Sequence, residues 1–396
     1  MVAKIEITKS IIPKDEFGPE YIINVYDPQI GMEGFLVIDN TVLGMAKGGI
    51  RMTPNVTAEE VWRLARAMTW KNSLAGIPFG GGKAGIIWPP AGATDKVGGE
   101  NELKKQFVQS FAKAIKIFTP KKYIAGPDVN TGEKEMKWFV EATGDWNSAT
   151  GKPENLCVRV LKDWQKCGIP HEAGSTGFGV AHATKVAVEA LKLNIKDVAV
   201  AIHGFGNVGT FTYKFLTEMG AKVIAIADHS GAIFCEDGFD EDKIGKLIAS
   251  NQKVAEYTGK AKKVNGDDFW AVPADILIPA SITDVIHEGN KDRINAKIIV
   301  EAANIPMREN IEKELFKRGI LIVPDFVANS GGVISSYSEY KGHYLKKMFQ
   351  LVEEKITKST KQVLKESLRQ NKNPREVAVE IAKKRILAKI NKKNKS

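Results

Sequence analysis

The segment that most constrains the fold of this chain is a glycine-rich turn, Gly-Phe-Gly-Asn-Val-Gly, at residues 204–209. The apolar run 198–202 before it predicts a strand, and residues 207–219 after it predict a helix. A second predicted strand, 222–227, ends in Asp228, 19 residues past the last of these glycines. In such a turn the first glycine permits a tight bend, the second lets the backbone approach a pyrophosphate, and the third packs helix on strand. The segment therefore predicts a Rossmann-type dinucleotide site at a helix N-terminus.

The candidate cofactor-binding residues of this segment are Gly204, Gly206, Asn207, Val208, Gly209 and Asp228. An aspartate at the end of the second strand favours NAD, because it bonds the adenosine ribose hydroxyls. His229 and Ser230 beside it could instead accept the 2′-phosphate of NADP. The sequence therefore leaves NAD and NADP as alternatives.

Strands and helices alternate regularly after about residue 170, with further short β-branched runs at 276–278, 298–300 and 320–323. This alternation predicts a parallel sheet with helices on both faces. We predict an α/β protein of two domains, the second of them doubly wound. Their expected bounds are 1–170 for a substrate-binding and assembly domain, completed by C-terminal helices in 330–396, and 171–329 for the dinucleotide domain.

A helix of the first domain carries a lysine where lysine is costly. Thr57 predicts the start of this helix as its N-cap. Val61, Leu64 and Met68 recur on one side, which predicts its buried face, and Lys71 continues that stripe. A buried ammonium needs a counter-ion, so the pattern indicates a bound anion.

Two more lysines adjoin glycines, which let a ligand approach the backbone. Lys47 precedes a Gly-Gly pair, and Lys83 follows three glycines and enters an apolar strand. Each lysine alone is typical of a solvated surface, but together with Lys71 they indicate a small anionic substrate. Asp128 follows Gly-Pro at a predicted strand end, where it would stay ionised beside the ammonium groups and could relay protons.

The net charge of +10 is unevenly distributed. Residues 341–396 contain 17 basic and 5 acidic side chains, whereas the other 340 residues contain 40 basic and 42 acidic ones. A polyanionic partner for the whole protein is therefore not indicated. We expect the basic tail to be solvated helix surface with a frayed end, and we expect no nucleic-acid partner.

Features that are missing bear on the compartment. The N-terminal residues show no apolar signal region, and the sequence contains no run of 18 apolar residues, which predicts a cytoplasmic protein with no membrane partner. Cys157 and Cys167 are ten residues apart, a spacing that fits no metal-ligand motif. We expect ordinary thiols at these positions and no metal site.

Seven segments, in this order, resemble the glutamate/leucine/phenylalanine/valine dehydrogenase family, and within it the glutamate dehydrogenases. They are KGGIRM (47–52), TWKNSLAGIPFGGGKAG (69–85), AGPDVNT (125–131), STGFGVA (175–181), HGFGNVG (203–209), EAAN (301–304) and ANSGGVISS (328–336). The resemblance runs from about residue 25 to 345. It implies oxidative deamination of an L-amino acid to a 2-oxo acid and ammonia, with hydride passing to NAD or NADP, and it implies a homo-oligomer, typically a hexamer.

The resemblance also implies roles for individual residues. Lys71 would hold the substrate α-carboxylate. Lys83 would be the catalytic lysine that activates water for attack on the iminium, with Asp128 as its proton-transfer partner. Thr176 would contact the nicotinamide carboxamide, and Asn304 would lie beside the nicotinamide ribose.

Substrate choice turns on the far end of the pocket. In the glutamate-specific branch the resemblance implies that Lys47 and Ser336 hold the side-chain carboxylate, and a buried lysine rejects leucine because its charge would stay unpaired. Glutamate is therefore the expected substrate, although Glu172 stands where glutamate dehydrogenases commonly carry arginine. Two alternatives remain open, namely the same chemistry on leucine, valine or phenylalanine, and a non-catalytic nucleotide- or nucleic-acid-binding protein.

Overall fold

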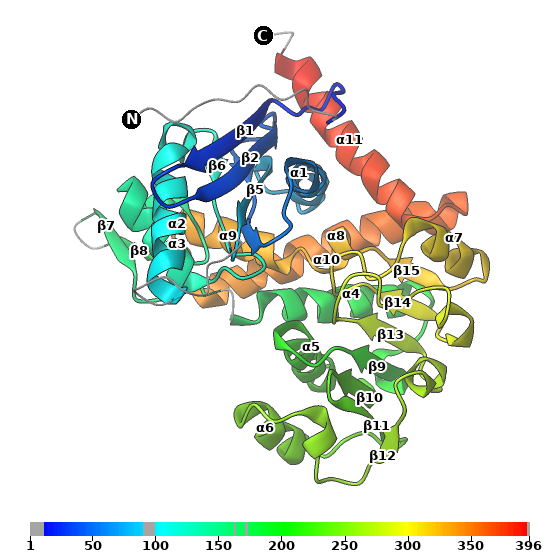
Figure 1. Ribbon diagram of the computed structural model, residues 1–396. Helices are drawn as coiled ribbons and strands as arrows, with labels where there is room; N and C mark the ends of the chain where they lie inside the picture. The colour runs from blue at the N-terminus through cyan, green and yellow to red at the C-terminus, as the bar shows by residue number, and fades with distance from the viewer. Residues whose placement is uncertain (1–11, 90–99, 162–163, 171–172, 394–396) are drawn as a thin grey trace. The chain divides into compact units, whose positions relative to one another are not determined.

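The computed structural model describes residues 12–89, 100–161, 164–170 and 173–393 (Figure 1). Backbone contacts divide the chain into two compact units. Unit 1 consists of Met1–Ala173, Val333–Met348 and Ala382–Ser396, and unit 2 of Gly174–Gly332 and Phe349–Ile381. The α/β class with a Rossmann-type second unit is as predicted. The division differs from the expected one in residues 349–381, which belong to unit 2 rather than to the N-terminal domain.

Unit 1 is built on a six-stranded mixed sheet. Its strands are β1 (Tyr21–Asp27), β2 (Met32–Asn40), β3 (Ala46–Lys47), β4 (Ile50–Thr53), β5 (Gly80–Ile87) and β6 (Tyr123–Ile124), in the order β1-β2-β5-β3-β6 with β4 also paired to β5. β5 pairs antiparallel with β2 and parallel with β3 and β4. Lys83 therefore lies within the central strand of the sheet, which already includes the three glycines before it.

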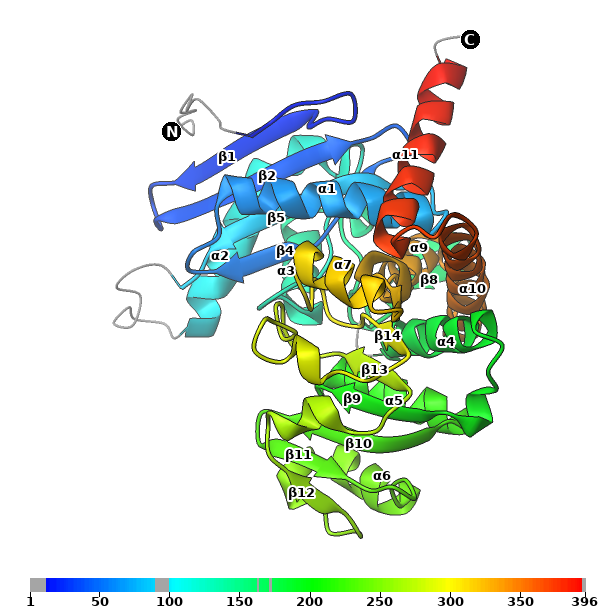
Figure 2. The same cartoon turned by 90° about the vertical axis from the view of Figure 1, so that its right-hand side faces the viewer.

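Helices cover both faces of this sheet (Figure 2). They are α1 (Ala58–Leu74), α2 (Glu100–Ala114) and α3 (Glu133–Thr143). Side chains of β2 alternate between the two layers, as period-2 geometry requires. Leu36 and Ile38 join the core of α2 and α3, whereas Phe35 and Val37 join the core that includes residues of α1.

The buried face of α1 is not the predicted one. The N-cap is confirmed, because the Thr57 side chain accepts a hydrogen bond from Glu60 N at 3.2 Å. However, the buried positions that follow Val61 begin with Ala65 and Thr69 and continue in the last turn, while Leu64, Met68 and Lys71 are only half-buried. The reason is Gly81 in β5, where any Cβ would overlap with the backbone and hydroxyl of Thr69, so the small side chains of α1 lie directly on glycine.

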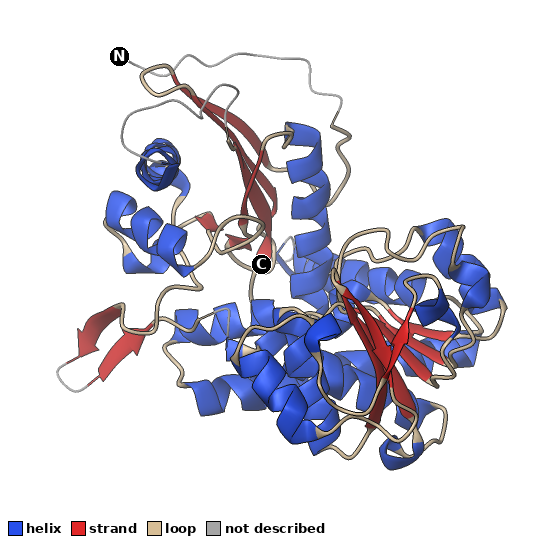
Figure 3. Cartoon of the chain, turned by 60° about the horizontal axis from the view of Figure 1, so that its bottom comes forward, coloured by secondary structure: helices blue, strands red, loops and turns tan. Residues whose placement is uncertain are grey.

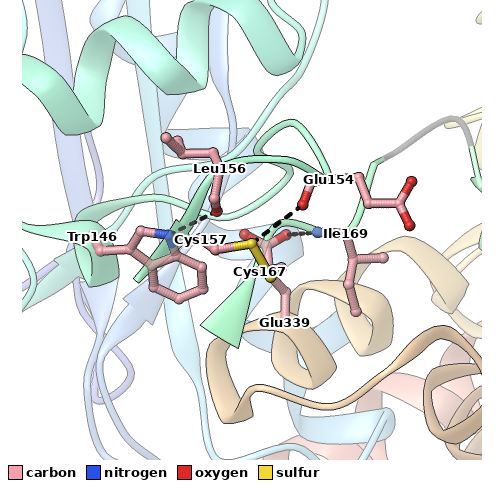
Figure 4. Close-up of a disulfide and its surroundings, with 7 residues drawn as sticks. All are labelled: Trp146, Glu154, Leu156, Cys157, Cys167, Ile169 and Glu339. Carbon is pink, nitrogen blue, oxygen red and sulfur yellow. Dashed lines mark hydrogen bonds between the residues drawn. A yellow bond between two sulfur atoms is a disulfide. The ribbon is translucent and has the colours of Figure 1, made fainter. Parts of the chain in front are cut away.

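A hairpin of unit 1 corrects the expectation of free thiols. Strands β7 (Cys157–Leu161) and β8 (Trp164–Cys167) pair antiparallel as a separate two-stranded sheet (Figure 3). Their register places Cys157 directly opposite Cys167 with a Cα–Cα distance of 4.0 Å, and the two form a disulfide (Figure 4). The prediction was wrong because the hairpin that brings the two cysteines together was not recognised. The prediction concerning Glu172 lies outside the described residues.

Unit 2 contains a seven-stranded sheet. Its strands are β9 (Ala199–His203), β10 (Lys222–Asp228), β11 (Gly231–Phe234), β12 (Lys262–Val264), β13 (Ile276–Pro279), β14 (Ile298–Val300) and β15 (Leu321–Val323), in the order β12-β11-β10-β9-β13-β14-β15. The five predicted strands are present and parallel. β11 and β12 add an antiparallel edge that was not expected. Chain order reverses between β9 and β13, and ligands of open α/β sheets bind beside such a reversal.

The helices of unit 2 begin with α4 (Ser175–Ala190), α5 (Asn207–Glu218), α6 (Glu241–Ala249), α7 (Glu309–Lys317) and α8 (Asp325–Ala328). Three further helices, α9 (Gly331–Lys341), α10 (Leu345–Gln370) and α11 (Pro374–Lys393), contain the points where the chain passes between the units. Short 3-10 turns lie at Lys116–Phe118, Trp146–Ser148, Ile195–Asp197, Val254–Glu256, Asp268–Ala271 and Lys291–Arg293. Over the part of the chain that the structure describes, no helix has the length and apolar character to cross a membrane.

Long-range contacts explain why 349–381 belongs to unit 2. The Phe349 ring on α10 packs edge-to-face against Phe178 of α4, with ring centroids 4.9 Å apart. Arg375 on α11 forms ion pairs with Glu301, Glu312 and Asp325 of the same unit. Helical periodicity alone specifies neither partner.

The basic C-terminal segment has a structural role in unit 1. Arg385 Nη1 donates to the carbonyl oxygens of Ser73 at 2.7 Å and Leu74 at 3.0 Å, at the C-terminal end of α1. A cation at the C-terminal end of a helix provides donors to carbonyl groups that have no partner within the helix, and it interacts favourably with the negative end of the helix dipole. Part of the tail charge is therefore used to hold α1, on which Lys71 lies.

Candidate functional site

The centre of the candidate site is a buried ion pair between Lys83 and Asp128. Lys83, on β5, is 6% exposed, and its Nζ contacts Asp128 Oδ2. Burial alone would raise the pKa of Asp128, but the charges of Lys83 and Arg51 outweigh that effect and lower it to about 2. Asp128 is therefore a carboxylate at neutral pH and holds the Lys83 ammonium in one place.

Neighbouring groups fix the position of Asp128. Its backbone N–H donates to Thr131 Oγ1 at 2.8 Å, and that hydroxyl donates to the Ile50 carbonyl at 2.6 Å. Arg51 Nε reaches Asp128 Oδ2 at 3.3 Å. The loop after β6 is thereby tied to β4, and the carboxylate is held from two directions.

Lys47, at the end of β3, is a second buried lysine. It is 3% exposed, and its Nζ donates to the Ala125 carbonyl at 3.0 Å. Burial lowers the pKa of Lys47 to about 7, with the charge of Glu339 opposing this change and those of Lys83 and Lys152 adding to it. Gly126 makes room for the ammonium group, because a Cβ at that position would overlap with Lys47 Nζ.

Lys71 and Ser336, the other predicted substrate-binding residues, also belong to unit 1. Lys71 is half-buried in the last turn of α1, and Ser336 is half-buried on α9. The structure therefore brings Lys83 and Asp128 into contact, places Lys47 within the electrostatic reach of Lys83, and leaves Lys71 and Ser336 accessible in the same unit.

Two charged residues of this region were missed by the sequence reasoning. Lys152 and Glu339 are fully buried, and Lys152 Nζ lies 2.6 Å from Glu339 Oε1. Glu339 lies three residues after Ser336 on α9, which puts the two on neighbouring positions of one helix face. That spacing is the signal that could have drawn attention to Glu339, whereas nothing in the sequence pairs it with Lys152.

The cofactor-binding candidates of unit 2 form the predicted strand–turn–helix. Gly204 has φ +105°, and a Cβ on Gly209 would overlap with the Gly204 carbonyl oxygen, so both positions require glycine. A Cβ on Gly206, in contrast, would meet no atom of the described chain within 4 Å. Gly206 is the N-cap of α5 and provides no side-chain cap to the N–H groups of the first turn, which include those of Asn207 and Val208. Open space before an uncapped helix N-terminus fits the pyrophosphate of a dinucleotide.

Asp228 ends β10, the parallel neighbour of β9, so it lies at the same edge of the sheet as this turn. Its Oδ1 accepts from Ser230 N at 2.7 Å and its Oδ2 from Val254 N at 3.0 Å. Burial would raise the pKa of Asp228, but these hydrogen bonds and the Ser230 hydroxyl hold it below its usual value. A negative charge held in place by backbone donors therefore lies at the same edge of the sheet as the glycine turn.

Thr176 and Asn304, the two candidates for the nicotinamide end, also lie near this edge. Thr176 is in the first turn of α4. Its neighbour Gly177 lies so close to α5 that a Cβ at that position would be 2.8 Å from the Val208 carbonyl oxygen. Asn304 follows β14, and its Oδ1 accepts from Asn329 Nδ2 at 3.0 Å. The hydroxyl of Ser175, which is fully buried, has no hydrogen-bond partner among the described residues. The described residues contain no cluster of three or more His, Cys, Asp or Glu side chains that could hold a metal ion.

The fold and the glycine turn of unit 2 define the class of dinucleotide-binding α/β proteins. Residues 19–145 match the family model described as the Glu/Leu/Phe/Val dehydrogenase dimerisation domain, and residues 167–394 match the model of the glutamate/leucine/phenylalanine/valine dehydrogenases. The chain belongs to this family, which confirms the predicted resemblance, and it is an amino-acid dehydrogenase.

Individual relatives agree with this assignment. The glutamate dehydrogenase of Aeropyrum pernix is 38% identical over 88% of this chain and 83% of its own length. The NADP-specific glutamate dehydrogenase of Saccharolobus shibatae is 38% identical over 81% of this chain and 75% of its own. Among solved structures, the glutamate dehydrogenase of Peptoniphilus asaccharolyticus aligns with a TM-score of 0.77 and 29% identity, covering 96% of this chain and 92% of that one.

Proposed function

We propose that this protein is a glutamate dehydrogenase, which deaminates L-glutamate oxidatively and reversibly to 2-oxoglutarate and ammonia. The observation that carries this substrate choice is Lys47, a buried ammonium group beside the Lys83–Asp128 pair. A second substrate carboxylate would give Lys47 the counter-ion that burial otherwise denies it, and would raise its pKa above the value of about 7. Leucine, valine and phenylalanine lack such a group.

The proposed roles follow from the chemistry of each side chain. Lys71 binds the α-carboxylate, while Lys47 and Ser336 bind the side-chain carboxylate. NAD or NADP, which the glycine turn at 204–209 and Asp228 would hold, would supply the acceptor for the hydride that leaves the substrate Cα as the amine becomes an iminium. Lys83 orients and activates the water that attacks this carbon, and the adjacent Asp128 exchanges protons with Lys83 as ammonia leaves.

Binding of NAD or NADP by unit 2 is supported by the glycine turn, its uncapped helix N-terminus and Asp228. A homo-oligomer, expected to be a hexamer, is supported by the match of residues 19–145 to a dimerisation domain. The cytoplasmic location stays a prediction, and the redox state of Cys157 and Cys167 in cells would test it, since disulfides are rare in reducing compartments.

The test of the substrate proposal is the variant Lys47→Leu. It should lower kcat/KM for glutamate by about 10³-fold or more, because the second carboxylate would be buried without a partner, and it should raise kcat/KM for leucine. Stopped-flow or steady-state reduction of NAD and NADP measures kcat/KM for both amino acids. The midpoint of thermal unfolding shows whether the variant is folded. An equal loss for both substrates in a folded variant would contradict the proposal.

A further inference from the structure

The buried pair Lys152–Glu339 is not explained by stability alone. Both residues are 0% exposed. Removing two charges from water is costly, and apolar replacements of such pairs are often equally stable. The pair therefore calls for a functional reason, and its surroundings supply one.

Glu339 is held rigidly by the loop on either side of the disulfide hairpin. Its Oε2 accepts hydrogen bonds from Gly151 N at 2.7 Å and Ile169 N at 3.0 Å, the latter drawn in Figure 4. Its Oε1 contacts Lys152 Nζ, which also lies 3.5 Å from the centre of the Trp146 ring. Two backbone donors on Oε2 and the Lys152 ammonium beside Oε1 hold this carboxylate in the core of unit 1.

The same loop reaches Lys47 through one carbonyl group. The Ala125 oxygen accepts from Lys47 Nζ at 3.0 Å and from Thr150 N at 3.0 Å, and Thr150 directly precedes Gly151. A short path of hydrogen bonds thus connects Lys47 to Glu339. On α9, the fixed Glu339 also limits how the helix can turn, and hence where Ser336 lies.

Three charged side chains act on Lys47 from the elements around it. They are Glu339 on α9, Lys83 on β5 and Lys152 in the loop before the hairpin. One of these charges is negative and two are positive, so removing Glu339 or Lys152 changes the field at Lys47 in opposite directions.

We propose that Glu339 and Lys152 are positioning residues that set the charge presented by Lys47, and thereby the preference of the enzyme for an amino acid with a second carboxylate. This inference rests on the proposed function and identifies the part of the protein that tunes its specificity. The negative charge of Glu339 favours the protonated form of Lys47, which is the form that binds a carboxylate. The positive charge of Lys152 disfavours that form and neutralises Glu339.

The test compares Glu339→Gln with Lys152→Met across pH 6 to 10, with glutamate and with norvaline, which lacks the second carboxylate. In Glu339→Gln the alkaline fall of kcat/KM for glutamate should move to lower pH, giving about a threefold loss at pH 8, or about half a pKa unit. In Lys152→Met the alkaline fall of kcat/KM for glutamate should move to higher pH, which gives a gain of similar size at pH 8. The double variant removes both charges, so its pH profile should return towards that of the wild-type enzyme. This comparison remains informative even if one of the single variants folds poorly.

Two results would overturn the inference. One is a shift of both single variants in the same direction, as a merely structural pair would give, and the other is an equal shift with norvaline. Absence of glutamate turnover in the wild-type enzyme would instead overturn the proposed function itself, together with this inference.

Discussion

Replacing Asp128 by asparagine removes one charge from the candidate site and keeps the shape of the side chain. The pKa of Asp128 is lowered from 3.8 to about 2, because the charges of Lys83 and Arg51 outweigh the effect of burial. That difference corresponds to about 2 kcal/mol of stability, at about 1.4 kcal/mol per unit. Because the folded pKa lies below the unfolded one, this stability is present above pH 4 and is lost as the pH falls through 2.

Asp128→Asn should therefore lower the free energy of unfolding by at least about 2 kcal/mol at pH 7, since Lys83 stays buried beside a neutral amide. The difference from wild type should shrink between about pH 4 and pH 2. The kcat for glutamate should fall by about 10² to 10⁴, the usual range for a group that moves protons. Urea unfolding across pH and steady-state reduction of NAD and NADP measure these two effects.

A matched control is Asp39→Asn. Asp39 is another buried carboxylate of unit 1, paired with Arg66 at 2.9 Å, and it has no proposed part in the reaction. Because burial raises the pKa of Asp39 despite the charge of Arg66, this variant should lose less stability than Asp128→Asn, with kcat changed less than about threefold. The reasoning would be refuted if Asp128→Asn kept more than a tenth of the wild-type kcat, or if the two variants lost kcat equally.

Three further outcomes are expected. Gly126→Ala places a Cβ on Lys47 Nζ and should raise the KM for glutamate about tenfold or more, measured beside norvaline as a control. Asp228→Ser removes a fixed negative charge and should raise the ratio of kcat/KM for NADP to that for NAD by about tenfold; an unchanged ratio would remove Asp228 from cofactor selection. Cys157 and Cys167 are ten residues apart, so their disulfide closes a short loop. Reducing it should lower the free energy of unfolding by at most about 3 kcal/mol through loop entropy. A larger loss would show that the hairpin anchors more of unit 1.

Local patterns in the sequence were sufficient to predict the dinucleotide unit. The glycine turn at 204–209 depends on contacts within a strand, a turn and a helix that follow one another in the chain, so their spacing is visible in the sequence. The parallel strands follow from the same kind of local pattern. The edge strands β11 and β12 were missed because their short runs lack the continuous apolar character of the buried strands.

The remaining features depend on pairs that lie far apart in the chain. Glu339 binds Gly151, 188 residues earlier, and no periodicity reveals such a partner. Likewise, helical spacing alone could not distinguish a buried face through Leu64 from one through Ala65, since that choice is made by Gly81 on a strand of another segment. Lys47 and Lys83 were selected by their glycine neighbours, whereas Lys71 was selected by a stripe that is not the buried face of α1, and the charges that act on Lys47 could not be predicted.

The central claim, a glutamate dehydrogenase, is tested most directly by comparing kcat/KM of the wild-type protein for glutamate, leucine, valine and phenylalanine with both NAD and NADP. Lys47 predicts that glutamate exceeds each of the other three by about 10³-fold or more with at least one cofactor. Turnover confined to leucine, valine or phenylalanine would contradict the account, because a buried ammonium would then face a substrate with no charge to pair with it.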